Sequence, residues 1–86
     1  MQTAIVENVE AVETSNPVIW VITNRTKDHG DKFVVRRQIP HADRIYIEKS
    51  CAVFDSLEEA RGHLPPGLIY LPRDTNDDAV IVEMWL

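Results

Sequence analysis

The basic side chains of the sequence gather in one segment, and they are the residues best suited to bind an anion. The 86-residue chain has a net charge of −5, yet residues 25–49 hold seven of its nine Lys and Arg residues. Clustered cations of this kind attract phosphate and other anionic groups. The predicted anion-binding residues are Arg25, Lys27, Lys32 and Arg36. Neutralisation of this basic segment by the acidic residues 50–86 explains the same pattern without a ligand.

Nucleic acid is not the partner we expect for this basic segment. Sheet modules that bind nucleic acid interleave aromatic side chains with basic ones for base stacking. Here Phe33 falls on the opposite side of the predicted strand from Lys32 and Arg36. The negative overall charge also opposes binding to a phosphate backbone. Binding of nucleic acid or another anionic ligand by the hairpin 25–44 is therefore our alternative function.

The cysteine and the three histidines offer little catalytic or metal-binding chemistry. Cys51 precedes the apolar residues 52–54, which contain no base to activate a nucleophile, so we expect a small buried side chain. The spacing of His29, His41 and His63 is not typical of zinc ligands. We predict no catalytic residue, no metal and no cofactor, although a deep pocket around His41 or Cys51 would favour an enzyme.

The acidic run 74–78 begins like a calcium-binding loop, with acidic or amide side chains at positions 1, 3 and 5. Such a loop also needs Gly at position 6 and Glu at position 12. Ala79 and Trp85 occupy these positions. We therefore predict a polar turn.

The elements around these residues predict a single α+β domain, an antiparallel sheet of four to five strands with one short helix packed on one face. Runs rich in β-branched, aromatic and alternating apolar residues are typical of strands. The expected strands are 18–23, 32–39, 44–48, 68–71 and 79–86, and residues 51–54 are extended. Residues 1–16 are predicted to be a flexible N-terminal tail before the domain at 17–86, because 14–17 form a breaker.

The helix start is the clearest local signal. Ser56 with Glu59 three residues later forms a capping box, and Pro65 ends the helix. The run 54–65, together with the ending 80–86, resembles small uncharacterised bacterial proteins, and this resemblance implies no activity.

Two charged residues fall among apolar positions of predicted strands. Arg37 shares its side of the strand with Phe33 and Val35, and Glu83 is the only acid in the last strand. Because an unpaired buried charge is costly, we predict that Arg37 pairs with Glu83 from an adjacent strand.

The composition predicts a cytoplasmic protein that self-associates. The start of the chain has no signal peptide pattern, no apolar run approaches the ~20 residues of a membrane helix, and the single cysteine suits a reducing compartment. Strands 18–23 and 79–86 are apolar on both faces, and one short helix is too small to cover a sheet. We therefore predict a non-catalytic interaction or regulatory module that forms a homo-oligomer or binds an unknown protein partner.

An intrachain alternative also remains open. The tail could fold back and lay Ile5, Val9 and Val12 on the uncovered face of the sheet.

Overall fold

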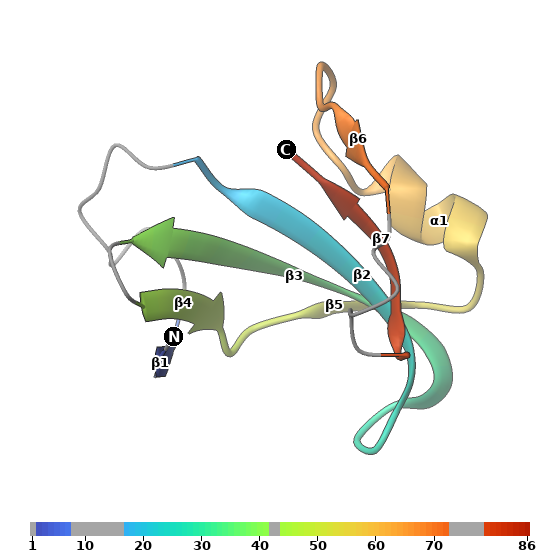
Figure 1. Ribbon diagram of the computed structural model, residues 1–86. Helices are drawn as coiled ribbons and strands as arrows, with labels where there is room; N and C mark the ends of the chain where they lie inside the picture. Colours follow the sequence, from blue (N-terminus) through green and yellow to red (C-terminus); the bar gives the residue numbers. More distant parts are fainter. Residues whose placement is uncertain (1, 8–16, 42–43, 73–78) are drawn as a thin grey trace.

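The computed structural model describes residues 2–7, 17–41, 44–72 and 79–86, which form one mixed sheet and one short helix (Figure 1). The strands are β1 (Gln2–Val6), β2 (Ile19–Thr26), β3 (Gly30–His41), β4 (Arg44–Glu48), β5 (Ala52–Phe54), β6 (Tyr70–Leu71) and β7 (Ile81–Trp85). The helix α1 spans Leu57–Gly62. The strand order is β1-β4-β3-β2-β7-β6, and β5 also pairs with β3.

The prediction of an antiparallel sheet of four to five strands is wrong in two respects, although the short helix and the strand-rich architecture are confirmed. The described residues form seven strands, and β1 pairs with β4 in parallel. Residues 2–6, which we assigned to the tail, form β1. Of the rest of the predicted tail, residues 1 and 8–16 lie outside the described residues. The partner of β1 is about 40 positions away in the sequence, so its local pattern does not reveal the pairing.

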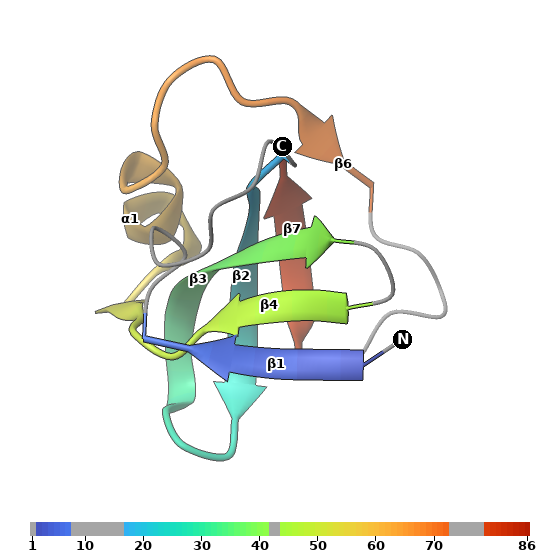
Figure 2. The same ribbon diagram turned by 90° about the vertical axis from the view of Figure 1, so that its left-hand side faces the viewer.

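The long strand β3 pairs along one side with two strands that are out of register with each other. Val35 faces Ala52 in β5, whereas Gln38 faces Ile47 in β4. From Val35 to Gln38, β3 advances by three residues, whereas its partner segment from Ile47 to Ala52 advances by five. The partner segment therefore has two extra residues at the break between β4 and β5. Such an irregularity bends a strand and changes where its side chains point. Figure 2 shows the result, with β1 and β4 crossing the direction of β2 and β7.

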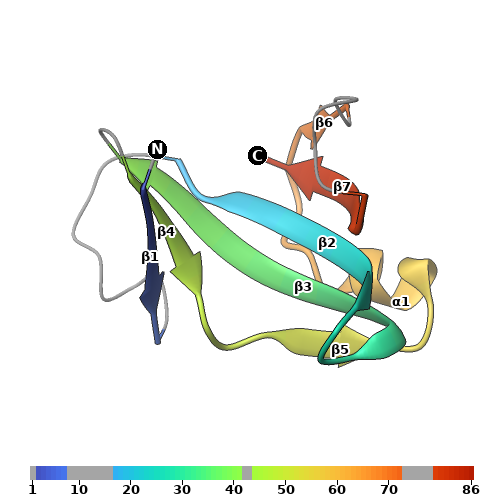
Figure 3. The ribbon, with the colours of Figure 1, turned by 60° about the horizontal axis from the view of Figure 1, so that its bottom comes forward.

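The core lies between the sheet and α1. Ile22, Val35 and Ala60 are buried together, with Trp20, Phe33, Phe54, Leu57, Leu64 and Val82 packed around them. Because side chains alternate along a strand, odd-numbered residues of β3 such as Val35 face α1, and even-numbered ones such as Val34 face away. We call these the helix-side face and the outer face. Figure 3 shows β5 leading into α1 beside the β2–β3 ribbon.

The helix begins where the sequence predicts. Ser56 is the N-cap, and its Oγ accepts a hydrogen bond from the Glu59 backbone N–H at 3.1 Å. The Glu59 carboxylate accepts from the backbone N–H of Asp55 at 3.3 Å. The capping interaction of Ser56 is thus confirmed, and the return bond from Glu59 reaches one residue further back than in the standard box.

Candidate interaction surface

The strand register brings four side chains into one line across the helix-side face. Arg37 in β3 faces Trp20 in β2, Trp20 faces Trp85 in β7, and Trp85 faces Tyr70 in β6. Residues that face each other in neighbouring strands project from the same side of the sheet. We call this line Arg37, Trp20, Trp85 and Tyr70 the aromatic row. Its members come from four separate strands, so no local sequence signal identifies it.

Ring contacts join the side chains within each end of the aromatic row, Arg37 with Trp20 and Tyr70 with Trp85. The guanidinium carbon of Arg37 lies 5.5 Å from the centroid of the Trp20 ring, a cation–π distance. The rings of Tyr70 and Trp85 are 5.3 Å apart and meet edge to face at 65°. At the C-terminal end of α1, the ring of the C-cap residue His63 contacts those of Trp20 and Phe54. Trp, Tyr and Arg are the residue types that dominate the energetics of protein interfaces.

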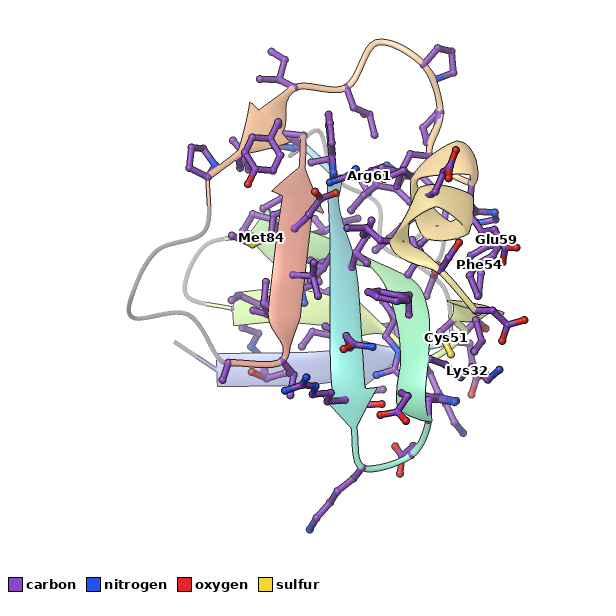
Figure 4. All side chains as sticks on the ribbon, turned by 90° about the vertical axis from the view of Figure 1, so that its right-hand side faces the viewer. Lys32, Cys51, Phe54, Glu59, Arg61 and Met84 are labelled. Carbon is purple, nitrogen blue, oxygen red and sulfur yellow. The ribbon has the colours of Figure 1, made fainter. Side chains whose placement is uncertain are left out.

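Two buried carboxylates flank the aromatic row, and each binds a guanidinium. Glu48 accepts from Arg37, with Nε 3.1 Å from Oε1. Glu83 accepts from Arg61, with Nε 2.9 Å from Oε1, and from the Trp85 indole N–H at 3.1 Å. Figure 4 shows Arg61 reaching from α1 towards β7. Both carboxylates are therefore compensated by charge and by hydrogen bonds, as burial requires.

The predicted pairing of Arg37 with Glu83 is wrong. The prediction assumed that their strands are neighbours, but β2 lies between β3 and β7. Arg37 instead pairs with Glu48 in the neighbouring strand β4. Glu83 receives its cation from α1, which lies above the sheet.

The ion pair on α1 shifts the ionisation of both partners. The hydrogen bond from Arg61 lowers the pKa of Glu83, and the Trp85 N–H adds to this effect, whereas burial opposes it. The same hydrogen bond raises the pKa of Arg61. Glu83 therefore remains charged at neutral pH, and the β7 end of the row contains a fixed ion pair.

Several cavities are lined in part by residues at the C-terminal end of α1. One of about 370 Å³ is lined mainly by Trp20, Arg37, Glu48, Cys51 and His63. Two others, of about 210 and 410 Å³, share the lining residues Arg61 and Trp85. The larger of these also includes Tyr70 and Glu83. Volumes of this size suit a side chain or a small ligand.

Exposed apolar side chains lie at the margins of the sheet. Among the described residues, the exposed large apolar side chains are Ile5, Val53, Ile69, Tyr70 and Leu86. The middle of the outer face is covered instead, because Val21 and Val34 are buried. We expected one face of the sheet to be uncovered. Instead, the exposed apolar side chains lie at particular edges of the sheet.

Three of these five side chains meet at one edge. Ile69 and Leu86 exchange two backbone hydrogen bonds, at 2.8 and 2.9 Å, so their side chains are neighbours on the outer face. Tyr70 follows Ile69 and projects from the opposite face, beside Trp85. We call Ile69, Tyr70 and Leu86 the β6 patch. Ile69 is 68% exposed and Tyr70 is 45% exposed.

The thiol of Cys51 has polar neighbours that its local sequence does not indicate. Its Sγ lies 3.7 Å from Nε2 of His29 and 3.9 Å from a terminal nitrogen of Arg36. Cys51 is also partly exposed, so the expectation of a buried apolar side chain is wrong. The β2–β3 turn supplies His29, which is 22 positions away along the chain. Pairing across the sheet, rather than the neighbouring residues 52–54, sets this environment.

The four predicted anion-binding residues have different surroundings. Lys32 forms an ion pair with Asp55, which raises the pKa of Lys32. Arg36 is partly buried beside Cys51, and its Nε is buried without a hydrogen-bond partner. Arg25 and Lys27 are exposed near the β2–β3 turn, and Arg25 has a φ of 60°. The charge of Lys32 is thus paired with a carboxylate of the same chain. Anion binding by these four residues stays a prediction.

Other predicted features can be placed more briefly. No group of three or more His, Cys, Asp or Glu side chains within the described residues is arranged to hold a metal ion. The acidic run 74–78 lies outside those residues. Within the same part of the chain, no helix has the length and apolar character needed to cross a membrane.

Comparison with protein-family models, with curated proteins and with solved structures finds no match for this chain.

Proposed function

We propose that this chain is a non-catalytic interaction module that self-associates, and that its contact surface is the β6 patch with the adjoining end of the aromatic row. The observation that carries the proposal is the convergence of Ile69, Tyr70 and Leu86 at one edge of the sheet. Clustered apolar exposure on a folded protein marks an interaction site.

The size of the chain supports this proposal. A domain of 86 residues buries only about 60–65% of the surface that its unfolded chain exposes. Small domains gain further stability from disulfides, metals or association, and a single cysteine forms no disulfide within one chain. We propose association as the source of this further stability, because covering Ile69 and Leu86 would bury additional apolar surface.

The side chains around the β6 patch also fit a contact surface. Trp85, Tyr70 and Arg61 belong to the residue types enriched at interface hot spots. The cavities beside Arg61 and Trp85 offer concave sites into which a partner's side chain could insert. We further propose a reducing, cytoplasmic location, which suits the partly exposed thiol of Cys51.

Sedimentation equilibrium of the full chain over a range of concentrations tests this proposal. We expect a dimer that the Ile69→Asp variant weakens by at least tenfold in dissociation constant, because the new charge would be buried in the contact. The matched control is Ile5→Asp, since Ile5 is equally exposed, at 71%, but belongs to β1 at the other end of the sheet. A monomer at every concentration, or a loss caused only by Ile5→Asp, would overturn the proposal.

An anionic ligand is the second candidate, and the buried Nε of Arg36 favours it. That nitrogen has no hydrogen-bond partner, and exposed Arg25 and Lys27 add positive charge near the turn. Titration with a short single-stranded oligonucleotide at low and high salt tests this candidate. Binding that weakens with salt and with Arg36→Met would support it, and absence of binding at low salt would exclude an oligonucleotide as the ligand.

A further inference from the structure

We infer that two copies of the chain join through their β6 strands, which pair antiparallel about a two-fold axis at Tyr70. This inference rests on the proposed self-association and specifies its geometry. The occupant of the β6 patch is then a second copy of the chain, presenting the same patch.

The backbone of Tyr70 has hydrogen-bonding groups that its pairing with β7 does not use. Ile69 and Leu86 form a doubly hydrogen-bonded pair, and such pairs alternate with non-bonded ones along an antiparallel ladder. The next pair, Tyr70 with Trp85, is therefore a non-bonded one. The N–H and C=O of Tyr70 consequently point away from β7. Among the described residues no strand pairs with β6 on that side, so these groups are available to another strand.

In a dimer with a two-fold axis, the same groups of the second copy can bond to the N–H and C=O of Tyr70. When Tyr70 faces Tyr70 of the second copy, each N–H donates to the other C=O, which gives two hydrogen bonds. Ile69 then faces Leu71 of the second copy on the outer face, and the reverse contact forms as well. The Ile69 side chain of each copy is thus covered by Leu71 of the other copy, as expected for an isologous contact.

The distribution of charge favours this edge over the other one. The chain has a net charge of −5, so two copies repel each other on average. Residues 62–72, which include β6, contain no Lys, Arg, Asp or Glu. At the opposite edge, β1 is followed directly by Glu7, whose carboxylate is 3.8 Å from Lys49. Pairing of β6 with β6 therefore brings no charged side chain of residues 62–72 against another.

Pro72 explains why the association would stop at two copies. An exposed strand edge invites open-ended pairing, and short edge strands and prolines limit it. β6 has only two residues, and Pro72 directly after it has no N–H to donate. The pairing is therefore centred on Tyr70, and it leaves no unpaired part of either β6 edge for a third copy.

Disulfide trapping tests the register directly. In the proposed dimer, Ile69 and the second copy's Leu71 form a non-hydrogen-bonded pair with Cα atoms about 4.5 Å apart, which suits a disulfide. We expect Ile69→Cys/Leu71→Cys, in a Cys51→Ser background, to form covalent dimers under mild oxidation. The matched control is Thr3→Cys/Ile5→Cys on the exposed side of β1, which should stay monomeric on a non-reducing gel.

Hydrogen exchange on the unmodified protein provides a second readout that does not depend on the variants folding. The Tyr70 amide should exchange at least tenfold more slowly above the dimer dissociation constant than below it. A dimer in sedimentation that shows neither the disulfide nor this protection would overturn β6 pairing while leaving self-association intact. A monomer in sedimentation would overturn both.

Discussion

The two buried ion pairs on the helix-side face differ in how well their cations are shielded from water. The Glu48 and Glu83 side chains are equally buried, each 8% exposed. Arg37 is 23% exposed and also lies on the Trp20 ring, whereas Arg61 is 50% exposed. The same carboxylate burial is therefore compensated by an enclosed cation in one pair and by a half-solvated one in the other. We therefore expect the two pairs to contribute unequally to stability.

The difference follows from the elements that supply the cations. Arg37 comes from a central strand, and its pairing with Glu48 joins β3 to β4 next to the break before β5. Arg61 comes from the last turn of a six-residue helix and ties α1 to β7. Water competes for the second guanidinium more than for the first.

The largest effect is expected for Arg37→Met. Removing the cation takes away the guanidinium that binds the buried Glu48 carboxylate, and breaking a buried ion pair in this way typically costs about 3–5 kcal/mol of unfolding free energy. Urea denaturation followed by tryptophan fluorescence measures this loss. The control is Arg37→Met/Glu48→Met, which should recover much of the loss because neither charge remains. A single variant as stable as the wild type would contradict the enclosed-pair interpretation.

A smaller loss is expected for Arg61→Met under the same conditions. Arg61 is half in water, and Glu83 keeps the hydrogen bond from the Trp85 indole. Comparing the two urea midpoints tests the ranking of the pairs. If Arg61→Met destabilises the protein more than Arg37→Met, the expected ranking of the two pairs is wrong. Exposure of the cation would then not determine how much each pair contributes to stability.

Removing the helix cap should affect only one of the pairs. Ser56→Ala loses the bond to the Glu59 N–H and is expected to cost about 0.5–2 kcal/mol. Because α1 carries Arg61, a double-mutant cycle should show a weaker Arg61–Glu83 coupling in this background. The Arg37–Glu48 coupling should be unchanged. Equal weakening of both couplings would mean that the cap acts on the whole fold.

The smallest effect is the pH dependence of the Arg61–Glu83 pair. The pKa of Glu83 is lowered in the folded state, chiefly by Arg61, so its contribution to stability is complete above the unfolded value of about 4.3. That contribution is lost as the pH falls through the lower folded pKa. Thermal unfolding should therefore show the difference between wild type and Glu83→Gln narrowing below about pH 4.3. A difference that stays constant down to pH 2 would contradict the assigned shift.

Local patterns account for much of the secondary structure. The capping box places the start of α1 correctly, because the Ser56 hydroxyl and the Glu59 N–H are only three residues apart. The strand predicted at 44–48 coincides with β4, and the strand predicted at 68–71 contains β6. These features depend on the conformational preferences of consecutive residues, which can be inferred directly from the sequence.

The tertiary structure decided which elements are neighbours. Placing β2 between β3 and β7 gave Arg37 and Glu83 different partners, and the parallel pairing of β1 enlarged the sheet. The aromatic row and the neighbours of Cys51 depend on the same pairings. Alternation along a strand specifies the face of each side chain but not the strand beside it. That choice depends on contacts between residues far apart in the chain, which no local pattern contains.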